Sequence, residues 1–266
     1  MRINGRTKLE ERADTQRIER EREFHNSVAK NEFGDRKLIS RLSWSYYNKG
    51  ERSPIWGPVW SQIELDGKHV LDYGSGDGEF SFELARRGAL VEGIDISESL
   101  VELATRKIPD GIPRPRFSVR DAHATGFPDA SFDYVFGNGI LHHLELEKAY
   151  REVARVLKPG GQSFFMEPME HHPLAVLLRK ATPTVRTVDE KPLSLEQIEM
   201  AGRFFDKFRH TEHYVLAVLA APVHLASKSA AFWVIKWLDT VDRAMIRILP
   251  ALRRYAWQSM LEMGKL

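Results

Sequence analysis

The stretch VLDYGSGDG, residues 70–78, decides the fold that we expect for this chain. An apolar, strand-like start is followed by three glycines at alternate positions. Glycine has no Cβ and accepts positive φ, so its backbone can approach a ligand closely. A glycine loop between a strand and a helix, at the carboxyl edge of a parallel sheet, is typical of nucleotide-binding α/β domains.

The sequence around this loop alternates β-rich runs with helical patterns, which predicts βαβ units on a parallel sheet. The predicted strands are 69–73, 89–95, 116–120, 132–137 and 161–167, and the predicted helices are 77–87, 97–107 and 146–157. The last helix ends at Lys158-Pro159-Gly160-Gly161, because proline and paired glycines stop a helix and turn the chain. We therefore expect a doubly wound, mostly parallel α/β fold.

The flanks of this region have a different character. Residues 1–60 are interpreted as an N-terminal helical cap, and 61–222 as the main domain with an insertion at 168–194 above the sheet. The alternating charges of 8–24 predict a helix, either a surface helix or a lid over the cofactor. Residues 223–266 are expected to form an amphipathic helical extension.

Two shorter signals organise the region after the insertion. Ser194 followed by Gln197 is a capping box that predicts a helix to about residue 205. The run FRHTEHYVLAVLA is expected to supply a closing hairpin or strand pair.

The composition of the chain limits which partners and which cellular compartment we expect. A net charge of +2 on 266 residues gives no reason to expect a nucleic-acid partner. The chain has no cysteine, so thiolate chemistry and disulfides are excluded. The charged N-terminus lacks the apolar region of a secretory signal, and the longest apolar run is too short to span a membrane. The sequence predicts a soluble, cytoplasmic protein.

The acidic residues around the glycine loop separate two candidate ligands. Asp95 ends the second predicted strand, 21 residues after Gly74, which suits a carboxylate that binds both ribose hydroxyls. The spacing G-x-G-x-G differs from the G-x-G-x-x-G of dinucleotide sites, since Gly78 comes one position early. Asp72 would repel a pyrophosphate but attract the amino group and sulfonium of a methionine moiety. These features favour S-adenosylmethionine over NAD.

At this point four motifs in order carry a family resemblance over about residues 65–168. Three stretches resemble the motifs of class I S-adenosylmethionine-dependent methyltransferases, in the group that includes quinone-biosynthesis and natural-product enzymes. They are VLDYGSGDGEFSFELARRGALVEGIDIS, RDAHATGFPDASFDYVFGNGILHHL and REVARVLKPGG. The resemblance implies a seven-stranded Rossmann-like sheet. It also implies that S-adenosylmethionine is held by Asp72, Gly74, Ser75, Gly76, Gly78, Asp95, Ile96, Asp121, Ala122, Asn138 and Gly139.

Candidate catalytic residues lie where the predicted fourth and fifth strands end. His142 or His143 is expected to face the acceptor as a general base, with packing or capping as the alternative for each. Glu167 is a further candidate, as are His171 and His172. We expect no metal, because adjacent histidines point to different faces of an element.

Aromatic residues outside the sheet suggest further contacts. Tyr46 and Tyr47 are predicted to contact the donor, against the alternative of packing within the cap. Trp233, Trp237 and Ile248 fall on one face of a helix at 232–248, with Lys236, Arg243 and Arg247 beside them. Peripheral membrane contact, a lipophilic pocket, a dimer contact and core packing all remain open for this helix.

The sequence thus predicts methyl transfer from S-adenosylmethionine to a small, partly apolar biosynthetic intermediate, with oxygen as the preferred acceptor atom. Two alternatives are an NAD(P)-dependent oxidoreductase and a catalytically silent, donor-binding regulatory subunit. The acceptor and the oligomeric state stay open.

Overall fold

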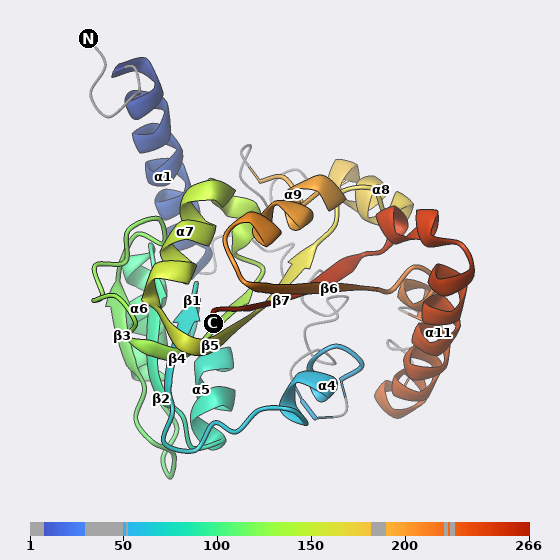
Figure 1. Ribbon diagram of the computed structural model, residues 1–266, viewed down its shortest axis with the longest axis horizontal. Helices are drawn as coiled ribbons and strands as arrows, with labels where there is room; N and C mark the ends of the chain where they lie inside the picture. Colours follow the sequence, from blue (N-terminus) through green and yellow to red (C-terminus); the bar gives the residue numbers. More distant parts are fainter. Residues whose placement is uncertain (1–7, 30–49, 52, 182–189, 221–222, 224–226) are drawn as a thin grey trace.

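The computed structural model describes residues 8–29, 50–51, 53–181, 190–220, 223 and 227–266 (Figure 1). Its centre is a seven-stranded sheet with the order β3-β2-β1-β4-β5-β7-β6. The strands are β1 (His69–Tyr73), β2 (Leu90–Asp95), β3 (Arg116–Val119), β4 (Phe132–Asn138), β5 (Leu157–Pro168), β6 (Lys207–His213) and β7 (Gln258–Gly264). Strands β1 to β5 pair in parallel, and β7 runs antiparallel to β5 and β6. The expected mostly parallel, seven-stranded Rossmann-like sheet is confirmed.

Helices cover both faces of the sheet, because successive strand residues point to opposite faces. In β1, Val70 belongs to one buried cluster and Leu71 to the other. The first cluster includes side chains of α4 (Trp56–Trp60), α5 (Glu79–Arg86) and α11 (Lys228–Ile248). The second includes side chains of α7 (Leu146–Val156) and α9 (Leu195–Glu199).

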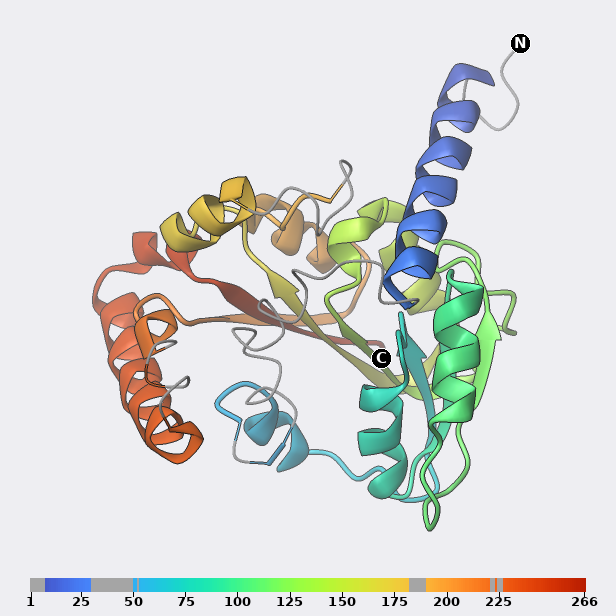
Figure 2. The same ribbon diagram turned by 180° about the vertical axis from the view of Figure 1, so that it is seen from behind.

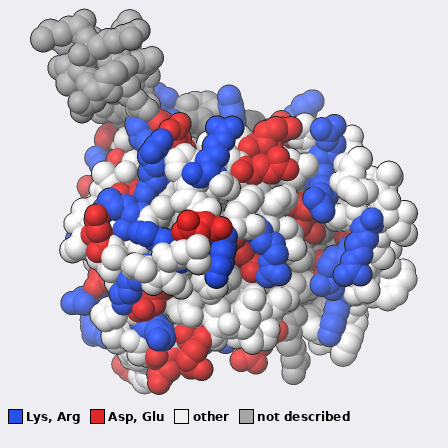
Figure 3. Space-filling view, in the orientation of Figure 1, with Lys and Arg blue, Asp and Glu red and all other residues white. Residues whose placement is uncertain are grey.

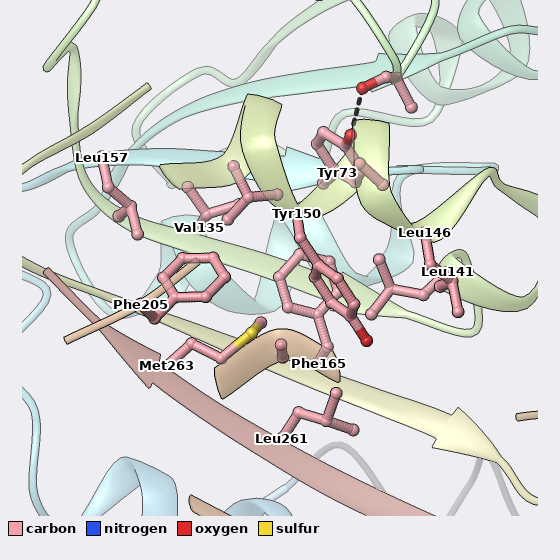
Figure 4. Packing of buried hydrophobic residues seen from close by; sticks show 14 of the residues in the cluster. Tyr73, Val135, Leu141, Leu146, Tyr150, Leu157, Phe165, Phe205, Leu261 and Met263 are labelled. Carbon is pink, nitrogen blue, oxygen red and sulfur yellow. Dashed lines mark hydrogen bonds between the residues drawn. The ribbon is translucent and has the colours of Figure 1, made fainter. Parts of the chain in front are cut away.

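The second cluster combines aliphatic side chains with a few large aromatic ones (Figure 4). Tyr150 of α7 lies among Phe165 of β5, Leu261 of β7 and Phe205. Tyr73 donates a hydrogen bond from its hydroxyl to the backbone carbonyl of Ala122. This bond ties the end of β1 to the loop after β3, where the candidate site begins.

Local signals in the sequence explain where several helices begin and end. The Ser97 hydroxyl caps α6 (Glu98–Arg106) by accepting a hydrogen bond from the Leu100 amide at 3.2 Å. The capping box of Ser194 and Gln197 is confirmed at the start of α9, and the chain continues as a 3₁₀ helix, η3 (Met200–Arg203).

The turn expected after α7 is present but lies inside β5. The strand register with β4 jumps from Leu157 opposite Phe132 to Gln162 opposite Tyr134. The proline and glycines between these positions are looped out of the ladder, and Gly160 has a φ of 78°. The proline and glycines therefore turn the chain as predicted, but the turn lies between two sections of one strand.

The C-terminal segment differs from the expectation. Residues 223–266 do not form a wholly helical extension, because 258–264 are strand β7 between β5 and β6. The run expected to close the sheet as a hairpin or strand pair supplies only β6, which pairs with β7 far along the chain. Two of the seven β7 residues are methionine and one is glutamate, so the segment lacks the β-branched side chains that mark a strand.

Between β6 and β7 the chain forms η4 (Ala217–Ala220), α11 and η5 (Pro250–Tyr255). Buried acids of α11 attach this insertion to the sheet. Asp242 accepts hydrogen bonds from the backbone amides of Val215, Leu216 and Ala217. Asp239 lies 3.1 Å from His213 Nδ1 at the end of β6.

The insertion after β5 carries α8 (Pro173–Ala181), and the chain returns through a bridge between Met169 and Leu193. At the other end of the molecule, α1 (Lys8–Ala29) projects beyond the body of the protein (Figures 1 and 2). Among the helices that the structure describes, none is long and apolar enough to cross a membrane.

Candidate active site

A cavity of about 240 Å³ opens at the carboxyl ends of β1, β2 and β4. Its walls include eight of the residues predicted to hold the donor: Gly74, Gly76, Asp95, Ile96, Asp121, Ala122, Asn138 and Gly139. These residues come from four separate loops, and the sheet order brings the loops to one edge. The cavity is therefore the candidate donor site.

The glycine loop is shaped for close approach of a ligand. Gly74, Gly76 and Gly78 have φ values of 84°, 54° and 86°, a region that other residues rarely adopt. A Cβ on Gly74 would come within 2.7 Å of Ile140, whereas one on Gly76 would meet no protein atom within 4 Å. Gly76 is thus the position at which the loop backbone itself faces open space.

Asp95 fixes this loop and presents its carboxylate to the cavity. One carboxylate oxygen accepts a hydrogen bond from the Gly76 amide at 3.0 Å, and the other from the Ser97 amide at 2.9 Å. Each oxygen retains a further lone pair, because a carboxylate offers about four acceptor positions. Asp95 can therefore brace the loop and accept hydrogen bonds from two ligand hydroxyls.

Asp121 is held in one orientation by His123. The Asp121 carboxylate lies 2.8 Å from both the Nδ1 and the backbone amide of His123. His123 Nε2 accepts a hydrogen bond from the Glu145 amide, so Nδ1 carries the proton that is donated to Asp121. Burial opposes ionisation of Asp121, but the hydrogen bonds from His123 outweigh it and lower the pKa of this carboxyl group.

Three residues predicted to hold the donor do not line the cavity: Asp72, Ser75 and Gly78. Asp72 points to the α5 face of the sheet, is 1% exposed and accepts a hydrogen bond from the Ser81 hydroxyl at 2.5 Å. Gly78 is the N-cap residue of α5, and a Cβ there would come within 2.8 Å of Phe82. The structure thus places these residues beneath the loop, where they shape it.

Helix α1 forms one wall of the cavity through Arg17, Ile18, Glu21 and His25. Asn26 fastens this helix to the start of α6 by accepting hydrogen bonds from the Ser97 hydroxyl at 2.7 Å and the Ser99 amide at 3.2 Å. Of the two interpretations of this helix, the lid over the site agrees with this position. The charge pattern predicted the helix but could not say which face it presents.

His142 and Glu167 form a buried pair beside Gly139. The His142 Nδ1 lies 2.7 Å from Glu167 Oε2, and the other Glu167 oxygen accepts hydrogen bonds from the Ile140 and Leu141 amides. Because Oε1 is occupied by the two amides, Oε2 accepts the Nδ1 proton of His142, and Nε2 of this ring keeps its lone pair. Glu167 is fully buried and can reach an acceptor only through His142.

His143 lines the cavity itself and faces α1. Its Nδ1 lies 3.2 Å from Glu21 Oε2, and Glu21 also lies 3.6 Å from His25 Nε2. Burial and the neighbouring His142 lower the pKa of His143, although Glu21 opposes the shift. His143 is therefore neutral at pH 7.

Among the residues that the structure describes, two groups in this region have ligand atoms close enough to hold a metal ion: Glu21, His25 and His143, and His142, His143 and Glu190. In each group a carboxylate lies near a histidine nitrogen, at 3.2 Å for Glu21 and His143 and 4.0 Å for Glu190 and His142. Contacts of this length between histidine and carboxylate side chains also occur without a metal. The expectation that no metal binds here stays a prediction.

The remaining predicted residues lie elsewhere. Tyr46 and Tyr47 lie outside the described residues, so their predicted contact with the donor stays a prediction. His171 is exposed beside Glu170. His172 is buried, with one ring nitrogen 3.1 Å from the Val215 carbonyl and the other accepting from the Ala175 amide. Both ring nitrogens of His172 therefore contact backbone groups of the protein and have a structural role in the insertion.

Residues 71–165 match the protein family described as a methyltransferase domain. The matched segment runs from β1 to β5 and contains the glycine loop, Asp95, Asp121 and His142. This segment of the chain is therefore similar to methyltransferase domains, in agreement with the resemblance to class I S-adenosylmethionine-dependent methyltransferases.

Two of the curated proteins to which this chain is similar are named as methyltransferases. A "Ubiquinone biosynthesis O-methyltransferase" of Coxiella burnetii is 35% identical over 105 residues, which cover 39% of this chain and 45% of the relative. A "27-O-demethylrifamycin SV methyltransferase" of Amycolatopsis mediterranei is 40% identical over 100 residues, which cover 36% of this chain and 37% of the relative. The match therefore spans less than half the length of either relative.

Solved structures share the fold over most of the chain. Magnesium protoporphyrin IX methyltransferase from Synechocystis, solved with bound SAH, has a TM-score of 0.58 at 16% identity and covers 94% of this chain and all of that one. Phosphoethanolamine N-methyltransferase 2 from Haemonchus contortus has a TM-score of 0.61 at 20% identity and covers 91% of this chain and 60% of that one. At these identities the likeness concerns the fold.

Proposed function

We propose that the protein transfers a methyl group from S-adenosylmethionine to a small-molecule biosynthetic intermediate, at an oxygen atom. The observation that carries this proposal is the cavity whose walls combine Gly76, Asp95 and Asp121 within a segment similar to methyltransferase domains. The curated relatives named as O-methyltransferases of ubiquinone and rifamycin biosynthesis support the choice of oxygen.

In this proposal each wall of the cavity binds one part of the donor. Asp95 accepts hydrogen bonds from the ribose hydroxyls, and Ile96 packs against the adenine. Asp121 accepts from the adenine amino group, with Ala122 beside it. Asn138 and Gly139 border the methionine end, where β4 leaves the sheet.

His142 is the proposed general base. Methyl transfer from a sulfonium is an in-line displacement, so alignment of donor and acceptor supplies the largest part of catalysis. A hydroxyl acceptor must also lose its proton, and a base contributes about two to four orders of magnitude to the rate. Glu167 acts as a positioning residue, because it fixes the ring and leaves Nε2 of His142 to accept the proton.

The proposed acceptor is small and partly apolar. The modest net charge gives no support to a nucleic-acid substrate. We place the reaction in the cytoplasm, with peripheral contact between residues 232–248 and a membrane surface. The division into a cap at 1–60, a main domain and a C-terminal part also remains a proposal.

The test measures S-adenosylhomocysteine production with a panel of phenols and enols that carry apolar side chains. Wild type should convert at least one of them, with a mass gain of one methyl group. His142→Ala should keep its affinity for S-adenosylhomocysteine and lose turnover by about a hundredfold or more. Glu167→Gln should lower kcat more than KM and shift the pH profile.

His171→Ala is the matched control, because it removes an exposed histidine of the insertion after β5, whereas His142 is buried and paired with Glu167. A normal rate for His142→Ala would overturn the assignment of the base. Binding of S-adenosylhomocysteine with no turnover of any acceptor would favour the silent regulatory subunit. Thermal stabilisation by NAD and none by S-adenosylhomocysteine would favour the oxidoreductase.

A further inference from the structure

The outer face of α11 exposes large apolar side chains to solvent. Trp233 is 66% exposed, Trp237 is 67% exposed and Ile248 is 85% exposed. The two tryptophans are four residues apart, so they lie on the same side of the helix. Core packing, one of the interpretations open for this helix, is therefore wrong for these residues, although Ile235 and Ala231 on the inner side are buried.

Basic side chains share this outer face. Lys236, Arg243 and Arg247 are exposed, and Lys236 Nζ lies 5.8 Å from the centre of the Trp233 ring. Both acidic residues of α11, Asp239 and Asp242, are fully buried. Among the side chains of α11 that the structure describes, the exposed charges are thus all positive. Figure 3 shows Lys and Arg side chains among uncharged ones at the end of the molecule where Figure 1 places α11.

Two of these cations are available to a ligand. Arg243 lies 3.2 Å from the buried Asp239 and is committed to it. Neither Lys236 nor Arg247 forms an ion pair with any residue that the structure describes. Both can therefore bind an external anion.

We propose that the outer face of α11, formed by Trp233, Lys236, Trp237, Arg247 and Ile248, binds the surface of an anionic phospholipid bilayer. Tryptophan is favoured at the boundary between lipid headgroups and acyl chains, and lysine and arginine bind headgroup phosphates. A second copy of the chain fits less well, because a two-fold interface would bring the cations of one copy against those of the other.

The fold holds this face in a fixed position at the edge of the sheet that carries the candidate site. Strand β6 ends at His213, which lies beside Gln258, and Gln258 lies beside Pro168 at the carboxyl end of β5. The chain then enters η4, where Leu219 is 63% exposed, and α11, which Asp242 fastens to the backbone. If the proposed methyltransferase function holds, a membrane bound here is the source of its partly apolar acceptor.

The experiment is co-sedimentation of the full chain with vesicles, without methyl donor. Vesicles of phosphatidylcholine alone are compared with vesicles that contain about one-quarter phosphatidylglycerol. Wild type should bind the anionic vesicles at least about tenfold more tightly, and added salt should weaken the binding. Emission of the exposed tryptophans should shift to shorter wavelength on binding.

Two double variants test the two parts of the face. Trp233→Ala/Trp237→Ala should lose most of the binding, with Leu90→Ala/Val119→Ala as the control at exposed apolar positions of β2 and β3. Lys236→Glu/Arg247→Glu should weaken binding by about fivefold or more for each reversed charge. Its control is Lys68→Glu/Arg114→Glu, which makes the same charge change at exposed positions outside α11.

Equal binding to neutral and anionic vesicles, or equal losses in the variants and their controls, would overturn the proposal. Self-association in sedimentation velocity that the tryptophan variant abolishes, with no vesicle binding, would assign the face to a second copy instead. Affinity for S-adenosylhomocysteine, measured on the same samples, separates failure of this proposal from failure of the methyltransferase assignment.

Discussion

Replacing Asp95 by alanine tests the donor site in the most detail. The carboxylate accepts hydrogen bonds from Gly76 and Ser97, and in the proposed complex it also accepts from both ribose hydroxyls. Hydrogen bonds to a charged group contribute about 1.5–3 kcal/mol. Because 1.4 kcal/mol is a factor of ten, Asp95→Ala should weaken binding of S-adenosylhomocysteine by about tenfold to a hundredfold. Isothermal titration calorimetry measures this change.

The same substitution also removes a brace of the glycine loop, so stability must be measured alongside affinity. Gly76 is partly exposed, but Ser97 is fully buried, so its amide would lose its acceptor away from water. We therefore expect a loss of about 1–3 kcal/mol in the free energy of unfolding. Asp77→Ala is the matched control, since Asp77 lies in the same loop but pairs with Lys107 at the surface and does not line the cavity. Wild-type affinity in Asp95→Ala would refute the placement of the ribose.

Further predictions concern the loop, acid stability and metals. Gly76→Ala should fold, since a Cβ there meets no protein atom, but the φ of 54° should lower its stability by about 1–2 kcal/mol. It should also weaken S-adenosylhomocysteine binding by about tenfold or more, because the methyl group enters the cavity; unchanged affinity would contradict this. Burial opposes ionisation of Glu152, but hydrogen bonds from Arg155 and Thr125 outweigh it, so its pKa is lowered on folding. Its stabilising contribution is present above its unfolded pKa and is lost as the pH falls through the folded one. The free energy of unfolding, measured by urea titration, should therefore fall less steeply with decreasing pH in Glu152→Gln than in wild type. EDTA should leave turnover unchanged, and a loss that Zn²⁺ restores would show that a metal binds at the histidines of the cavity.

Much of the fold was predictable because local signals agreed with it. Alternating apolar runs, the capping box of Ser194 and Gln197 and the breaker residues after α7 act through neighbouring residues in the chain. Strand β7 could not be found this way, because its sequence is not strand-like and its partners lie far away along the chain. Pairing between β5 and β6 decides its conformation.

The residues of the site could be predicted where the position of a residue in a loop determines its role. They could not be predicted where the role depends on the direction in which a side chain points. Gly76, Asp95 and Asp121 line the cavity as expected. Asp72 does not line the cavity. Successive residues of β1 point to opposite faces of the sheet, and Asp72 points to the face covered by α5, where it contacts Ser81. The wall formed by α1 depends on contacts with α6 across the chain, which the charge pattern of the helix does not encode.

A crystal structure of the full chain with S-adenosylhomocysteine tests the central claim most directly. The account predicts the ribose hydroxyls on Asp95, the adenine beside Asp121 and Ala122, and the sulfur near Gly139 on the side of His142. A ligand outside this cavity, or one whose sulfur faces away from the His142 side, would contradict the account.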